Sequence, residues 1–392
     1  MKKRLITAAV AATIATPMAA SADVTVYGQL HYSIDSIDLN ENTGGVGPGM
    51  RRFPTGPLGH GATYLQGTGI DSLAQGYDGS GVNSHNSRFG IKGSEDLGNG
   101  LSAVFQMEFS ISGDDLGGVN NNRNTYVALA GSWGVAGIGQ VDTPYKSSTG
   151  SLELFSEQVG DNNALFFDDI RAQDAVFYMS PNWNGFSFVA AVVMPSLDND
   201  ADGIEATSIA ATYSNGPWFA SLAYEELSGE MVDVLYSSTN TTDPNLTTMN
   251  DGINDANDFS KWRLGLGYTA NGFHVGFVYE DREVNDLAFV PVAFEEDGES
   301  WQLSASYTVG NNTFKIAYGE ADGLVRDSSH NFNVSDAEMW SIGVDHKLSN
   351  RTKIYAAYTD FESDDNEPLV FLGFSDVDTE YDAFSVGIIH KF

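Results

Sequence analysis

The stretch with the most suggestive spacing of ionisable residues runs from Asp142 to Asp174, DTPYKSSTGSLELFSEQVGDNNALFFDDIRAQD. Glu153, Glu157 and Asp161 recur every four residues, which would place three carboxylates on one face of a short helix. Such a row attracts cations or pairs with basic groups across confined water. The alternative is a solvated surface loop, because connections longer than about 15 residues are usually either disordered or functional.

A second acidic pattern consists of Asp198, Asp200 and Asp202, followed by Gly203. It copies the first half of a calcium-binding loop, in which oxygen ligands two residues apart converge on the ion. The twelfth position is Ile209 rather than Glu, so the bidentate ligand is missing. We therefore expect no cofactor, with a divalent cation at this acidic turn as the alternative. The sequence contains no G-x-S-x-G motif, which would have indicated a hydrolase.

Residues 1–22 are predicted to be a secretory signal peptide. Three basic residues precede an apolar run that ends in the small residues Ala20, Ser21 and Ala22, a typical cleavage site. Removing three of the 19 basic residues leaves a formal charge of 16 − 53 = −37 for a chain that begins at Asp23. This charge excludes a nucleic-acid partner, which needs a basic surface. The chain has no cysteine. Beyond the signal, no segment has the roughly 18 apolar residues of a membrane-spanning helix, which leaves an exported soluble protein or a membrane barrel.

Several segments alternate, residue by residue, between an apolar face and a polar or very small one. This period of two predicts β-strands. Aromatic residues lie at the ends of the apolar stripes, as they do at the two interfaces of a bilayer, whereas a soluble sandwich has no such order. Lys261, Arg263 and Lys315 fall on the polar face. The apolar stripes are Trp262, Leu264, Leu266 and Tyr268; Phe273, Val275, Phe277 and Tyr279; Trp301, Leu303, Ala305 and Tyr307; Phe314, Ile316 and Tyr318; and Trp340, Ile342 and Val344.

The connections between these strands alternate between long and short. A Gly-rich loop from Tyr32 to Asn86 is followed by a tight turn at 96–100, and the rhythm continues to a last strand at 378–392. The pattern predicts an all-β fold in which residues 23–392 form a 16-stranded antiparallel transmembrane β-barrel. Outer-membrane barrels have an even strand number, short periplasmic turns and long outer loops. Closure also satisfies every backbone hydrogen-bonding group in lipid.

Three stretches resemble the Gram-negative general porins. The run from Ser87 to Leu101, SRFGIKGSEDLGNGL, is similar to the second and third strands of that family. The early run VYGQ, which ends at Gln29, and the final run VGIIHKF, which ends at Phe392, match the two chain ends. The resemblance implies a homotrimeric outer-membrane pore of a Gram-negative bacterium, with Phe392 read by the barrel-assembly machinery. It also implies contact with outer-membrane lipid and lipopolysaccharide.

In this family the third external loop folds into the barrel and narrows it, and by that likeness the stretch from Asp142 to Asp174 is the constriction loop. Some members carry a lysine at the first-strand position where this chain has Gln29. The stretch 113–122 resembles the latching loop of the family, through which neighbouring protomers contact one another. The resemblance implies two facing sets of constriction residues, which are the basic Arg88, Lys92, Arg123 and Arg171 and the acidic Glu153, Glu157, Asp161, Asp168 and Asp169.

We therefore expect passive diffusion of small hydrophilic solutes and ions. A narrow passage with acids on one side and basic groups on the other selects by charge and size. The uncharged Gln29 and the acidic outer loops predict a mild preference for cations. A substrate-specific porin with a saturable solute site is the alternative, and a barrel enzyme or an adhesin is a more distant one.

Overall fold

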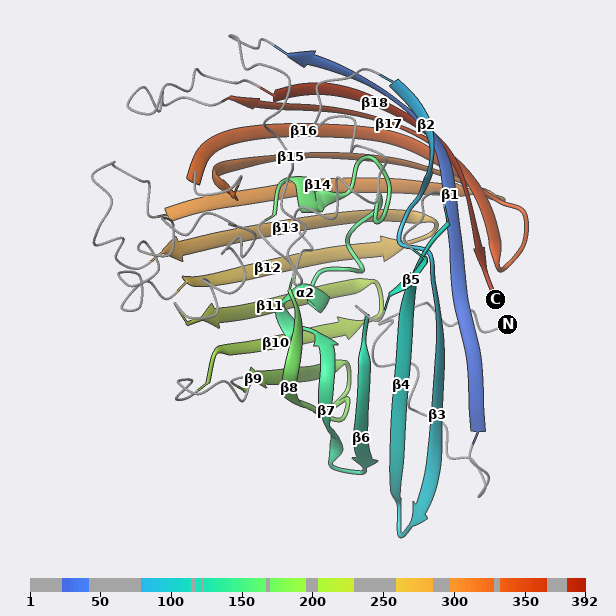
Figure 1. Ribbon diagram of the computed structural model, residues 1–392, viewed down its shortest axis with the longest axis vertical. Coiled ribbons are helices and arrows are strands. Elements are labelled where there is room, and N and C mark those ends of the chain that lie inside the picture. The colour runs from blue at the N-terminus through green and yellow to red at the C-terminus, as the bar shows by residue number, and fades with distance from the viewer. Residues whose placement is uncertain are drawn as a thin grey trace, which may run out of the picture.

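A computed structural model describes residues 23–41, 79–113, 118–120, 123–166, 170–194, 204–228, 259–284, 297–327, 332–364 and 379–392. Most of these residues lie in strands (Figure 1). The strands are β1 (Asp23–Glu41), β2 (Gly79–Ser84), β3 (Arg88–Gly98), β4 (Leu101–Ser112), β5 (Gly118–Asn120), β6 (Thr125–Gly131), β7 (Gly134–Asp142), β8 (Arg171–Met179), β9 (Phe186–Val193), β10 (Ala206–Asn215), β11 (Trp218–Leu227), β12 (Phe259–Ala270), β13 (Phe273–Val284), β14 (Asp297–Val309), β15 (Asn312–Asp327), β16 (Phe332–Lys347), β17 (Thr352–Asp364) and β18 (Thr379–Lys391).

The sheet is antiparallel and closed. Apart from β2 with β3 and β5 with β6, each strand pairs with the next along the chain, and β18 pairs with β1. β2 and β3 both pair with β1, and β5 and β6 both pair with β4. Each of these two pairs is one interrupted strand, so the 18 segments make 18 − 2 = 16 barrel strands. The predicted 16-stranded antiparallel barrel is confirmed.

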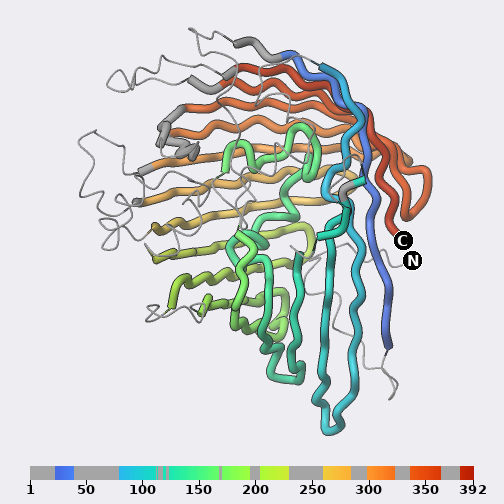
Figure 2. The backbone as a smooth tube through the Cα atoms, viewed as in Figure 1, coloured from blue at the N-terminus to red at the C-terminus, as the bar shows by residue number. Residues whose placement is uncertain are grey.

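Short turns gather at one end of the barrel. β3 and β4 are joined through 99–100, β6 and β7 through 132–133, and β10 and β11 through 216–217. Phe392 exchanges backbone hydrogen bonds with Gly28 at this same end, so both ends of the described chain lie beside the turns. The first long loop begins later than the sequence indicated, because β1 continues past Tyr32 to Glu41. Figure 2 shows the first and last strands lying side by side.

The two faces of the wall differ as the alternation predicted. The side chains of Leu303, Ile316 and Ile342 are each about half exposed on the outside. Lys261 and Arg263 face the interior and are buried. On the outside, Trp262 contacts Tyr279, Trp301 contacts Tyr318, and Trp340 contacts Tyr358, which forms an aromatic belt. A barrel with an aliphatic band bordered by aromatic residues suits a bilayer.

Residues 143–166 leave the wall after β7 and lie against its inner face (Figure 1). Leu152, Phe155 and Val159 are buried there in one cluster with Val278 and Ala317 of the wall. At Gly160 the loop backbone comes so close to β16 that an added Cβ would lie 2.3 Å from the Ser341 hydroxyl. We call residues 143–166 the inward loop.

The helix expected over residues 153–161 is not formed, and that prediction is wrong. The loop contains only α2 (Pro144–Ser147) and the 3₁₀ turn η3 (Asn162–Ala164), with turns between them. Thr143 caps α2 and Pro144 occupies its first turn, where a missing N–H costs nothing. β8 starts at Arg171, so the insertion also ends earlier than Asp174. Among the described residues, no helix is long and apolar enough to cross a membrane.

Candidate pore constriction

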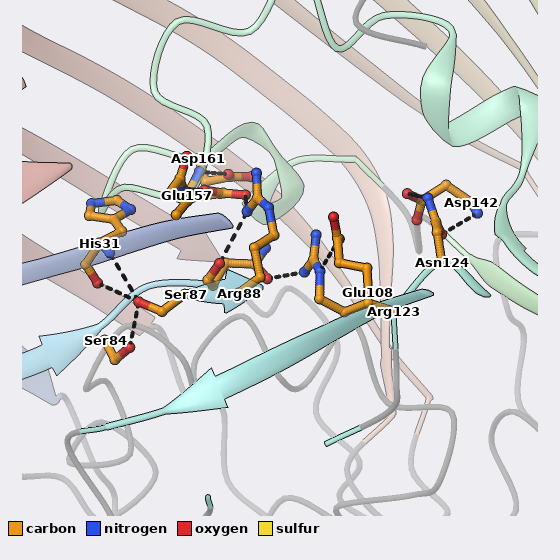
Figure 3. A network of polar contacts seen from close by, with 12 residues as sticks. His31, Ser84, Ser87, Arg88, Glu108, Arg123, Asn124, Asp142, Glu157 and Asp161 are labelled. Carbon is orange, nitrogen blue, oxygen red and sulfur yellow. Dashed lines mark hydrogen bonds and ion pairs between the residues drawn. The ribbon is translucent and has the colours of Figure 1, made fainter. Parts of the chain in front are cut away.

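Glu157 lies where the inward loop meets the wall formed by β1 and β3. Its carboxylate accepts hydrogen bonds from the Gln29 amide (2.7 Å) and from the Arg88 guanidinium (2.6 Å). Gln29 and Arg88 are directly opposite one another in the β1–β3 register, so both side chains extend to the same face of the wall. Figure 3 shows Arg88 extending toward Glu157. A charge-assisted bond of this length is among the stronger ones in proteins. The loop is thereby joined to the wall by an ion pair.

The backbone at Glu157 is unusual, with φ of +61°. This region is costly for a residue other than glycine and needs support from its surroundings. Asp161 supplies that support, because its carboxylate accepts hydrogen bonds from the Glu157 N–H (2.6 Å) and the Asn163 N–H (3.0 Å). Asp161 is buried, and Glu153 accepts a bond from the Asn162 N–H (3.2 Å). In these contacts, Asp161 and Glu153 shape the loop, and Glu157 contacts the basic wall.

Arg123 forms a second ion pair on the wall. Its Nε donates to Glu108 of β4 at 2.5 Å, and its Nη1 donates to the Asn86 side chain. Glu108 also accepts a bond from the Tyr27 hydroxyl (2.9 Å). Asn86 lies in the break between β2 and β3 and has φ of +53°. The interrupted strand therefore provides an amide oxygen for Arg123.

Arg171 lies at the other end of the inward loop, away from Glu157. It forms an ion pair with Asp142 at 2.9 Å, and Lys146 of α2 lies 3.6 Å from the same carboxylate. Asn124 accepts a bond from Arg171 Nε. Its amide donates a bond to Asp142 (Figure 3). These contacts close the base of the loop, where β7 ends and β8 begins. Lys92 lies separately, with its ammonium 4.9 Å from the centre of the Tyr27 ring.

The structure brings some of the expected residues together and not others. Arg88 and Glu157 meet directly, whereas the described ion-pair partners of Arg123 and Arg171 are Glu108 and Asp142, which were not among the predicted constriction residues. Period-two alternation could have placed Glu108 on the inner face, because it lies opposite Gly90 in register, two residues from Arg88. The remaining acids that the sequence analysis named, Asp168, Asp169, Asp198, Asp200 and Asp202, lie outside the described residues. In the part of the chain that the structure describes, no group of three or more His, Cys, Asp or Glu side chains could hold a metal ion.

Tyr145 of α2 anchors the start of the inward loop. The fully buried ring has the Lys261 ammonium and the Arg263 guanidinium each 4.5 Å from its centre. The hydroxyl donates to Glu280 at 2.7 Å, and the backbone N–H donates to the Ser208 hydroxyl at 3.0 Å. Burial, with Glu280 beside it, raises the pKa of the Tyr145 hydroxyl well above its ordinary value, so the group stays protonated as a donor.

Further anchors follow along the loop. Backbone carbonyls at 152, 154 and 165 accept bonds from Ser304 (3.0 Å), Lys315 (2.9 Å) and Ser300 (2.6 Å), respectively. The Lys315 ammonium also donates to Gln158 (2.7 Å) and lies 4.4 Å from the centre of the Phe155 ring. These donors come from β14 and β15, while Glu157 reaches β1 and β3. The inward loop therefore spans the interior from one wall to another.

A closed barrel with an apolar belt outside, ionisable side chains inside and a loop fixed across its interior defines an outer-membrane channel. The chain belongs to the Gram-negative porin family, whose sequence profile matches residues 7–366. An outer membrane porin protein of Bordetella pertussis is 26% identical, with 100% of each chain covered. Two solved structures share the fold. An anion-selective porin from Comamonas acidovorans has a TM-score of 0.64 at 21% identity, with 95% of this chain and 100% of that one covered. The trimer form of OmpT from Vibrio cholerae has a TM-score of 0.61 at 14% identity, with 95% and 100% covered.

Replacing Tyr145 with Leu is expected to loosen the start of the inward loop, whereas Tyr145→Phe keeps the ring between its two cations. A desolvated cation–π contact is worth about 2 kcal/mol. We expect excess noise and variable step size in single-channel currents of the Leu variant, and steady currents near the wild-type level for the Phe variant. Identical current noise in all three proteins would show that the ring does not hold the loop.

Proposed function

We propose that this protein is a passive diffusion pore for small hydrophilic solutes and ions, narrowed by the inward loop. The observation that supports this most directly is the bridge from Glu157 on the loop to Gln29 and Arg88 on the wall. Opposite charges fixed at such short range in confined water generate a strong local field, and a field of this kind sorts solutes by charge.

Purified protein reconstituted into a planar lipid bilayer tests the proposal. We expect stepwise currents whose conductance rises in proportion to salt concentration and does not saturate. A current that saturates with, or is blocked by, one solute would instead support a substrate-specific porin. Folded protein without any conductance would contradict the pore and favour the enzyme or adhesin alternatives.

We also propose a mild preference for cations, which arises at the outer mouth. The segments 229–258 and 365–378, which the strand pattern predicts to be outer loops, contain several acids and neither Lys nor Arg. At the constriction, by contrast, Arg88 pairs with Glu157 and Arg123 with Glu108, so these charges largely offset one another. A preference that comes from the mouth weakens at high salt, because the Debye length falls from about 10 Å at 0.1 M to about 3 Å at 1 M. The anion-selective structural neighbour is too distant in sequence to indicate the selectivity of this chain.

The functional unit we propose is a homotrimer in contact with lipopolysaccharide, inserted by the barrel-assembly machinery. The family resemblance supports each of these partners. Phe392, the proposed assembly signal, also has a structural role. Its backbone forms hydrogen bonds with Gly28, and its ring covers that glycine so closely that a Cβ added at residue 28 would clash with the ring. The latching-loop stretch 113–122 is described only in part, at 113 and 118–120.

A further inference from the structure

Gln29 lies between two basic residues in one row across the seam of the barrel. In the β1–β18 register Gln29 is opposite Lys391, and in the β1–β3 register it is opposite Arg88. Directly opposite residues in antiparallel strands extend to the same face, with Cβ atoms about 5 Å apart. The uncharged position therefore has a positively charged side chain on each side.

The strand alternation places Lys391 on the inner face. Ser385 and Ile389 are buried toward the interior, while Val386 and Ile388 are about half exposed on the outside. Lys391 lies two residues after Ile389, so its side chain extends to the same inner face of β18. The charged neighbours that act on its ammonium are Arg88, Lys353 and Glu157, and Glu157 and Arg88 form the loop-to-wall bridge.

We propose that Lys391 provides the positive charge of the constriction wall that the first strand lacks at Gln29, and that it is a selectivity-determining residue of the pore. The inference rests on the proposed function. Because the Arg88–Glu157 and Arg123–Glu108 pairs each sum to zero, an additional ammonium in this row makes the local balance positive. Lys391 thereby opposes the cation preference of the acidic mouth.

Neutralising Lys391 tests this directly. In Lys391→Gln we expect the cation-to-anion permeability ratio to rise roughly threefold at 0.1 M salt, because one unit charge within several ångströms of a permeating ion is only partly screened. The double variant Gln29→Lys with Lys391→Gln returns the charge to the same row and is expected to restore the wild-type ratio. Lys347→Gln, at the exposed turn end of β16, removes the same charge elsewhere and is expected to leave the ratio unchanged.

A cysteine variant separates pore lining from any role in assembly, because the natural chain has no cysteine. After Lys391→Cys has inserted into the bilayer, a cationic methanethiosulfonate reagent is expected to return the reversal potential toward the wild-type value, and an anionic one to move it further toward cations. Conducting channels whose reversal potential does not respond to either reagent, or to Lys391→Gln, would overturn the role of Lys391. Absence of conductance in the wild-type protein would instead overturn the proposed function.

Discussion

Replacing Glu157 with Gln is expected to shift the zero-current potential of the channel toward anions. The substitution removes the negative charge of the carboxylate that accepts bonds from both Gln29 and Arg88, and it breaks the Arg88–Glu157 ion pair. Gln keeps the size of the side chain and can still accept a hydrogen bond, so the change is mainly one of charge. We expect the anion-to-cation permeability ratio to increase roughly threefold in a salt gradient at 0.1 M.

Replacing the basic residues of the wall is expected to shift the zero-current potential in the opposite direction. Arg88→Ser together with Arg123→Ser shortens two side chains and removes two positive charges, so we expect a larger conductance and a stronger cation preference. Glu153→Gln is a comparison within the loop, where its carboxylate accepts a bond from the backbone at Asn162, and we expect a smaller shift of the reversal potential than for Glu157→Gln. If Glu157→Gln and the double Arg variant both left conductance and reversal potential unchanged, the inward loop would not be the narrow part of the pore, although the barrel would remain.

Leu303→Arg is expected to prevent most of the protein from assembling in the outer membrane. Leu303 is about half exposed in the aliphatic band, between Trp301 and Tyr307 on the outer face of β14. A lipid-facing Arg near the bilayer midplane costs about 2–4 kcal/mol, which is a large share of the stability of most proteins. The amount of heat-modifiable, folded barrel in outer-membrane fractions measures the effect.

Two controls identify the cause of this loss. Leu303→Ala removes the side chain without adding charge and is expected to assemble nearly normally. Leu264→Arg, on the same face of β12, is expected to behave like Leu303→Arg. Wild-type levels of both Arg variants would show that these side chains do not face lipid, and the assignment of the two faces would then be wrong.

Period-two alternation predicted the barrel because it is a local property of the chain. A strand exposes every second residue to the same environment, so the sequence alone predicts that Leu303 faces outward and Lys315 faces inward. Strand ends were less accurate, since β1 continues past Tyr32 into residues without a clear apolar stripe. The alternation of long and short connections predicted the strand number, because turn residues interrupt the apolar–polar alternation between one strand and the next.

The pairing of individual charges could not be predicted in the same way. The inward loop has no repeating backbone geometry, and the left-handed conformation of Glu157 depends on Asp161 accepting its N–H. Spacing by fours therefore indicated a helical face that does not exist. The partners Glu108 and Asp142 follow from which strands are neighbours in space, which is a property of the closed sheet.

The seam between β1 and β18 has a consequence for the order in which the protein gains its activity. Ser385 donates to Asp35 across this seam from 350 positions away in the chain, and Lys391 and Gln29 face one another there. Contacts between such distant positions form late, since the entropy of closing so long a loop must first be overcome. Pairing of β18 with β1 thus both closes the sheet and places Lys391 opposite Gln29. A barrel in which this seam had not yet paired would lack the row of Lys391, Gln29 and Arg88 across β18, β1 and β3.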